Sequence, residues 1–196
     1  MKNTNIIKNT FLFAVACIAI IGCKRDKDAP VAPVPQPVNE EELITTVVLT
    51  FITTVEPRDT FELRWADPDG DGGLAPVFTT EILPAHTSFT LSVQVLNEST
   101  VPAEDITDEI AAEDEEHQLF FLRTGAAPVV SYADTDGNGH PIGLNNTAAT
   151  ADAGTGTLTL VLRHSPDKGA SGVSTGDITN AGGDTDIEVE FAVEVN

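Results

Sequence analysis

The stretch Ile187-Glu-Val-Glu-Phe-Ala-Val-Glu-Val195 decides the fold. Every second residue is apolar, and Glu188, Glu190 and Glu194 stand between. Successive side chains of a β-strand point to opposite faces of a sheet. This alternation therefore predicts a strand with one face in a core and the other in solvent.

The same period of two recurs upstream. It is clear in the segments 61–65, 89–95 and 158–162, and weaker in Ile44–Thr54, Pro76–Leu83, His117–Arg123 and Val129–Ala133. Short strands at short spacing are typical of sandwiches. The sequence thus predicts an all-β fold, an Ig-like antiparallel β-sandwich of about eight strands.

Two segments break this pattern. Glu104–Glu116 is rich in Ala, Asp and Glu and places Ile106 and Ile110 four residues apart, which predicts one short acidic helix with Asp105 or Thr107 as N-cap. The glycine-rich stretch Asp167–Gly183 predicts a long loop. No alternation of strands and helices appears, which argues against a doubly wound α/β fold.

The chain begins with a basic segment, carrying Lys2 and Lys8, followed by an apolar run from Phe11 to Ile21. This run is shorter than the roughly 20 residues of a membrane span, as expected for a signal peptide. Its end, Ile20-Ile21-Gly22-Cys23, is similar to the lipobox of bacterial lipoproteins. That resemblance implies removal of residues 1–22 and attachment of lipid to Cys23.

Residues 23–42 contain prolines at positions 30, 33, 35 and 37, which predicts an extended tether between the lipidated Cys23 and a single domain at 43–196. Lys24–Asp28 loosely resembles the surface-export signal of Bacteroidota lipoproteins, but its acids are not adjacent. We therefore expect a lipid anchor in the outer membrane, with the protein on the periplasmic face or the cell surface.

The charge composition limits the kinds of partner that the protein is expected to bind. The chain carries 31 acidic against 10 basic residues, a net charge of −21. This charge disfavours nucleic acid and favours cations, although solubility outside the cell alone is the better explanation of it. The two cysteines are Cys17, within the predicted signal peptide, and Cys23. The mature chain is thus expected to have neither a disulfide nor a cysteine nucleophile.

Two acidic loops carry the pattern of a calcium site. Asp67, Asp69 and Asp71 stand at alternate positions before glycine, and Asp134, Asp136 and Asn138 repeat the spacing. Alternate oxygens followed by glycine open the calcium loop of helix–loop–helix proteins, but neither loop has the closing glutamate. Asp, Asn and Gly are also common turn residues. Calcium binding and simple turns both stay open.

The histidines suggest a second metal. His117 opens one predicted strand directly after Glu116, and His164 closes another. Strand ends at one rim of a sandwich could bring these three together, and two histidines with a carboxylate suit zinc. No two histidines have a recognised local zinc spacing, so isolated surface histidines are the alternative.

The sequence contains a nucleophile motif, but without the secondary structure that the motif requires. Gly172-Val-Ser174-Thr-Gly176 matches G-x-S-x-G, but the nucleophile elbow needs a strand before it and a helix after it. Here the motif lies within a predicted loop. We therefore expect no enzyme activity, and a hydrolase ranks last among the alternatives.

The whole pattern resembles a group of small Bacteroidota outer-membrane lipoproteins. The similarity rests on the lipobox, the tether, Asn39–Thr46, Asp67–Gly73, Leu96–Ser99, Glu116–Gln118 and Leu162–His164. Members often carry the label "type 1 periplasmic binding fold", which implies a two-lobed α/β receptor that this chain lacks the length and helices to form.

From the anchor, the tether and the loops we expect an extracytoplasmic module that binds a ligand or partner, with calcium as a possible stabiliser. The alternative is a zinc-handling lipoprotein that assists an outer-membrane uptake receptor.

Overall fold

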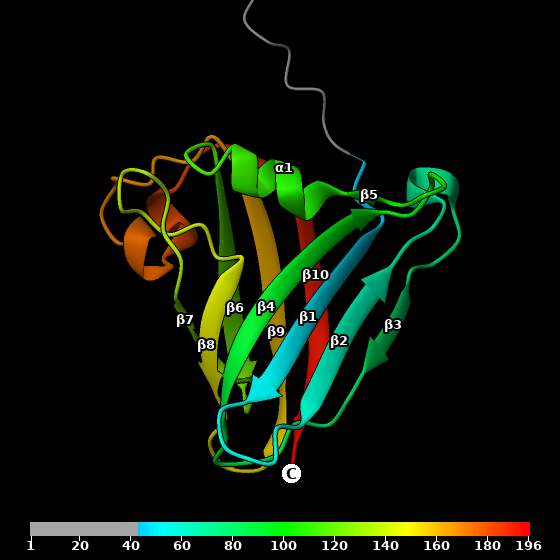
Figure 1. Cartoon of the computed structure of the whole chain (residues 1–196), viewed down its shortest axis with the longest axis vertical. Coiled ribbons are helices and arrows are strands. Elements are labelled where there is room, and N and C mark those ends of the chain that lie inside the picture. The colour runs from blue at the N-terminus through cyan, green and yellow to red at the C-terminus, as the bar shows by residue number, and fades with distance from the viewer. Residues whose placement is uncertain (1–42) are drawn as a thin grey trace, which may run out of the picture. The chain divides into compact units, whose positions relative to one another are not determined.

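The computed structural model describes residues 43–196, except the side chain of Asp71. The predicted signal peptide 1–22, Cys23 and the whole of the predicted tether lie outside the described residues. The described part contains ten strands and one α-helix (Figure 1). They are β1 Thr46–Thr53, β2 Thr60–Ala66, β3 Val77–Thr80, β4 Ser88–Asn97, β5 Glu104–Asp105, α1 Ile106–Ala112, β6 His117–Gly125, β7 Val129–Tyr132, β8 Asn145–Ala149, β9 Gly154–His164 and β10 Asp184–Val195.

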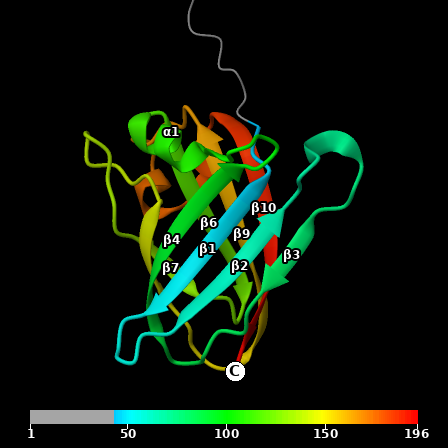
Figure 2. The ribbon, with the colours of Figure 1, turned by 45° about the vertical axis from the view of Figure 1, so that its right-hand side comes forward.

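The strands form two antiparallel sheets. The larger has the order β3-β2-β1-β4-β8-β7, with β5 paired to β4, and the smaller has the order β10-β9-β6. Figure 2 shows β4, β1 and β2 in front of β6, β9 and β10, with α1 across one end. The chain is therefore a sandwich, as predicted.

The main core lies between the two sheets. Central strands of the larger sheet contribute Leu49, Phe51 and Phe89, all fully buried, and Phe51 meets Phe89 edge to face at 5.7 Å between ring centres. From the smaller sheet, Leu160 and Phe191 enter the same core. These are the inward positions of the alternating strands, whose burial supplies most of the driving force for folding.

The predicted fold class is confirmed, and the details differ in two places. The strands β5 and β8 were not predicted. The helix is shorter than the predicted Glu104–Glu116, although its N-cap is one of the two expected residues: Asp105 accepts a hydrogen bond from the backbone N–H of Thr107. Ile106 and Ile110 are buried, so α1 closes one end of the core.

The long β9–β10 connection, residues 165–183, carries a small core of its own. Val173 and Ala181 pack there against Phe120 and Val161, on the outer face of the smaller sheet. Two short 3-10 turns, Val173–Thr175 and Ile178–Asn180, lie within this connection. No helix within residues 43–196 is long and apolar enough to cross a membrane.

Candidate metal centre

Three strands of the smaller sheet bring side chains together at one end. Because neighbouring antiparallel strands run in opposite directions, the start of β6, the end of β9 and the start of β10 lie at the same end of the sheet. His117 is the first residue of β6 and pairs in register with His164, the last residue of β9. Asp186 lies at the start of β10, which is the partner of β9 on its other side.

The two histidines are in direct contact. His164 Nδ1 lies 3.1 Å from His117 Nε2, and the rings meet edge to face. His117 is only 3% exposed, whereas His164 is partly open to solvent. The interpretation of isolated surface histidines therefore does not describe this pair.

Each of these histidines turns its second ring nitrogen to an oxygen. His117 Nδ1 lies 3.3 Å from the backbone carbonyl oxygen of Glu113. His164 Nε2 lies 3.8 Å from the carboxylate of Glu116. A carbonyl only accepts hydrogen bonds, so Nδ1 of His117 carries the proton and Nε2 presents its lone pair toward His164.

Asp186 supplies the carboxylate of the cluster. Its Oδ2 lies 3.9 Å from His117 Nε2, and the donor atoms of His117, His164 and Asp186 all lie within 4.8 Å of one another. The register of β10 against β9 shifts between Thr185 and Ile187, which marks a β-bulge at Asp186. Bulges re-aim side chains that strict alternation would send to the other face.

Burial keeps His117 available as a ligand. Desolvation lowers the pKa of His117, and the nearby charge of His164 acts in the same direction. The carbonyl of Glu113 and the carboxylates of Asp186 and Glu113 oppose the shift but do not cancel it. A neutral imidazole is the form that binds metal ions.

The spacing suits a tetrahedral transition metal. Zinc binds imidazole nitrogen at about 2.0–2.1 Å, which puts two such nitrogens roughly 3.3 Å apart at a tetrahedral angle. The observed 3.1 Å between the facing nitrogens is close to this value. Asp186 lies farther away, at 3.9 Å from His117 and with all three donor atoms within 4.8 Å, so its side chain must move toward both histidines, by up to about 1.5 Å, to complete such a site.

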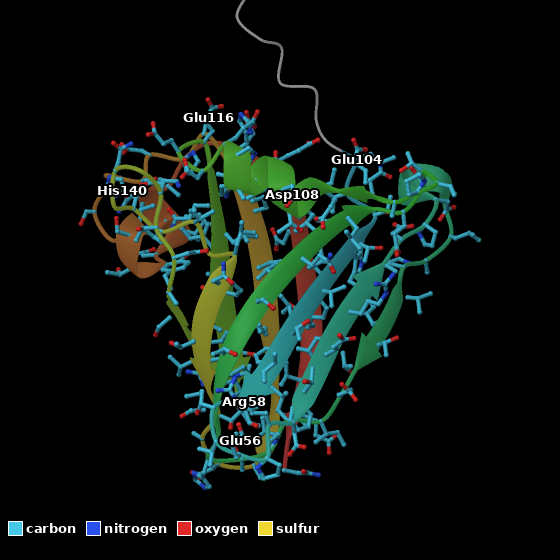
Figure 3. All side chains as sticks on the ribbon, in the orientation of Figure 1. Glu56, Arg58, Glu104, Asp108, Glu116 and His140 are labelled. Carbon is cyan, nitrogen blue, oxygen red and sulfur yellow. The ribbon has the colours of Figure 1, made fainter. Side chains whose placement is uncertain are left out.

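Glu116 has a different place from the predicted one. The sequence suggested Glu116 as the ligand beside His117 and His164, but its carboxylate faces the outer nitrogen of His164. Figure 3 shows Glu116 at the end of the domain that α1 covers. Glu116 thus lies on the outer side of His164, and Asp186, which the sequence did not single out, lies near the inner nitrogen of His117.

The loop with the second calcium pattern is tied by its own carboxylates. Asp134 accepts hydrogen bonds from the backbone N–H groups of Gly143 and Asn145, at 2.8 and 2.7 Å. Asp136 accepts from the N–H of Asn138 and from that of His140, both at 2.9 Å. These contacts are those of turns, and calcium binding here stays a prediction.

Asp136 also meets a buried cation. Lys168 Nζ lies 3.0 Å from its Oδ2, and both side chains are nearly inaccessible to solvent. Burial alone would raise the pKa of Asp136, but hydrogen bonds from Lys168, His140 and Asn138 outweigh burial and lower it. Lys168 therefore already neutralises the charge of Asp136, the carboxylate that would stand at the centre of a calcium loop.

The first calcium pattern forms a tight turn. Residues Gly70–Gly72 adopt a 3-10 helix, and the backbone N–H of Gly70 bonds to the carbonyl of Asp67 at 3.1 Å. Asp69 accepts from the N–H of Leu74 at 3.3 Å. Since the side chain of Asp71 lies outside the described part of the chain, calcium binding at Asp67, Asp69 and Asp71 also stays a prediction.

Ser174, the serine of the G-x-S-x-G motif, lies beside a histidine that the motif did not predict. Its hydroxyl lies 3.1 Å from His140 Nδ1 and donates to the carbonyl oxygen of Lys168 at 3.0 Å. Because a hydroxyl has one proton, His140 then donates to Ser174 and does not act as its base. Ser174 and Tyr132 line an open cavity of about 330 Å³.

Comparisons with known proteins add no assignment: no protein-family model, curated protein or solved structure matches this chain. The case for function therefore rests on the sequence and on the geometry of the cluster formed by His117, His164 and Asp186.

Proposed function

We propose that the chain is a membrane-anchored, extracytoplasmic lipoprotein whose β-sandwich binds a divalent transition metal, zinc in the first place. His117, His164 and Asp186 are the ligands. The anchor is the lipid predicted on Cys23.

One observation carries the proposal. In each histidine one ring nitrogen faces the other histidine, and the second lies near an oxygen, at 3.3 Å from the Glu113 carbonyl for His117 and at 3.8 Å from the Glu116 carboxylate for His164. Histidines that bind metals commonly donate their second N–H to a carboxylate or a carbonyl, which fixes the tautomer and the ring orientation. The orientation of the two rings thus supports the interpretation as a pair of metal ligands.

The donor set selects the class of metal. Imidazole nitrogen suits zinc, copper, nickel and iron, whereas calcium prefers six to eight oxygens. A binding module with this set would collect a transition metal outside the cytoplasm. The strongly acidic chain, with a net charge of −21 over the full sequence, would raise the local concentration of cations.

Calorimetry tests the proposal on the full chain in detergent, freed of metal with a chelator. We expect one zinc ion to bind per chain, and the heat to disappear in His164→Ala. The exposed His86 provides a matched control, since His86→Ala removes a histidine that only meets Asp152. Zinc binding weaker than about millimolar, or equal binding by His164→Ala, would contradict the proposal.

A further inference from the structure

We propose that the metal held by His117, His164 and Asp186 keeps one coordination position for a ligand from outside the chain, and that a neutral nitrogen donor such as imidazole fills it. This inference rests on the proposed function and specifies the kind of partner that the site accepts.

The ligand count leaves a position open. Zinc sites with four protein ligands are structural, and those with three leave a place for water or another molecule. Across residues 43–196, the three side chains form the one group of His, Cys, Asp or Glu whose donor atoms gather this closely. The described part of the chain thus offers three ligands where a structural zinc site has four.

The neighbouring glutamates stand on the wrong side to complete the set. Glu116 lies 3.8 Å from the outer nitrogen of His164, and Glu113 lies 3.9 Å from the outer nitrogen of His117. The lone pairs of the two nitrogens in an imidazole ring point away from each other. A carboxylate that contacts one nitrogen therefore does not reach a metal bound to the other.

The open position is accessible. His117 is buried, but the side chains of His164 and Asp186 are 13% and 12% exposed. Glu113 and Glu116 are more than half exposed, so the cluster lies at the surface of the sandwich end. A small molecule or the side chain of a partner can approach from the side of His164 and Asp186.

Charge selects the kind of donor. A divalent ion is balanced by Asp186 together with the carboxylates of Glu113 and Glu116, which lie beyond the two histidines. An anion would add negative charge to this already acidic surrounding. A neutral imidazole adds none, and imidazole is a ligand that zinc and cobalt both accept.

Cobalt makes the open position visible, because zinc has a filled d shell and no d–d absorption. The full chain in detergent is loaded with one equivalent of Co²⁺, and its visible spectrum is followed during titration with imidazole and, separately, with azide. We expect a saturable change with imidazole, and binding of azide roughly tenfold weaker, the scale of one unit of charge at a partly exposed site.

Variants separate the possible failures. Wild-type bands that are missing, or that persist in His164→Ala, would contradict the proposed metal site itself. Bands that form but do not respond to imidazole, or that vanish as imidazole strips the metal, would overturn the open position alone. A response to imidazole in Glu116→Gln but not in the wild type would show that Glu116 fills the position. Azide binding as tightly as imidazole would overturn the argument from charge.

Discussion

At the scale of residues, Asp186 and Glu116 lie near the same histidine pair with different tasks. Asp186 is near the inner nitrogen of His117, and Glu116 near the outer nitrogen of His164. We expect Asp186→Asn to lower zinc affinity about a hundredfold and Glu116→Gln about tenfold, because the second removes only the support of a ligand. Competition with a coloured zinc chelator measures both. A larger loss in Glu116→Gln would restore Glu116 as the ligand.

A second residue-scale prediction concerns Lys168. This buried lysine pairs with Asp136 and also donates to the backbone carbonyl of Asp114, in the turn that leads to Glu116. Removing one partner leaves the other charge buried and unpaired. We therefore expect Lys168→Met to lower the free energy of unfolding by roughly 3 kcal/mol, measured by urea denaturation.

The exposed pair of Arg58 and Glu56 provides the control for this variant. Solvent screens such pairs, so Arg58→Met should leave the urea midpoint nearly unchanged. Similar small shifts in both variants would mean that Asp136 finds another partner or binds a proton when Lys168 is lost.

At the scale of elements, the candidate centre depends on how β10 begins. The bulge at Asp186 follows Gly183, which has φ +70° and lies against the end of β9. A Cβ atom at Gly183 would lie 2.3 Å from the carbonyl oxygen of His164, whereas one at Gly182, which has φ +58°, would meet nothing within 4 Å. Both glycines need the left-handed region, but only Gly183 is also in close contact.

This pair of glycines yields a matched test. Gly182→Ala introduces backbone strain alone, about 1 kcal/mol, while Gly183→Ala adds a clash with the backbone that carries His164. We expect Gly183→Ala to cost at least about 2 kcal/mol and to weaken zinc binding, whereas Gly182→Ala keeps the affinity. Urea denaturation and zinc titration measure the two effects. Equal affinities would show that the start of β10 does not position the ligands.

The elements also show what the sequence can reveal. The strongly alternating strands β4, β9 and β10 were predicted because inward positions in a sandwich must be apolar. β8 was missed because its inward residues are Asn146 and Ala148, which carry little apolar signal. The short β5 was hidden at the head of the predicted helix.

The candidate centre was predictable only in part. The strand-end positions of His117 and His164 in an antiparallel sheet brought the two histidines to one rim. Asp186 was not predicted, because strict alternation would place its side chain on the opposite face of the sheet from that of Ile187. The local pattern of residues gives no sign of a bulge. Glu116 was chosen for its place beside His117 in sequence, but the register sends it to the outer nitrogen of His164.

At the scale of the whole molecule, the stability of the metal-free fold depends on pH through two groups whose pKa values folding lowers. The pKa of His117 is lowered from 6.5 and that of Asp136 from 3.8. In both cases the unfolded chain binds the proton more readily than the folded one. Their contributions to stability are therefore present at higher pH and are lost as pH falls below about 6.5 for His117 and below about 3.8 for Asp136.

Urea denaturation at pH 7.5, 6.5 and 5.5, with a chelator present, tests the first of these windows. We expect the free energy of unfolding to fall toward pH 5.5, and to fall less in His117→Gln, the difference being at most about 1.4 kcal/mol per pH unit. An equal slope in both proteins would mean that burial of His117 does not govern this range.

Metal binding should stabilise the whole molecule, because the ligands come from three strands that unfolding separates. At a zinc concentration one hundred times the dissociation constant, binding adds about 2.7 kcal/mol to the free energy of unfolding. For a domain of this size that corresponds to a rise in Tm of about 5–10 °C, measurable by scanning calorimetry of the full chain. Asp186→Asn should lose most of the rise at the same zinc concentration.

Calcium should give a smaller rise, and any rise that it gives should persist in Asp186→Asn, because the acidic loops do not share this ligand. If calcium stabilises as strongly as zinc, and both effects vanish with Asp186, the cluster is an oxygen-preferring site and the assignment to a transition metal is wrong.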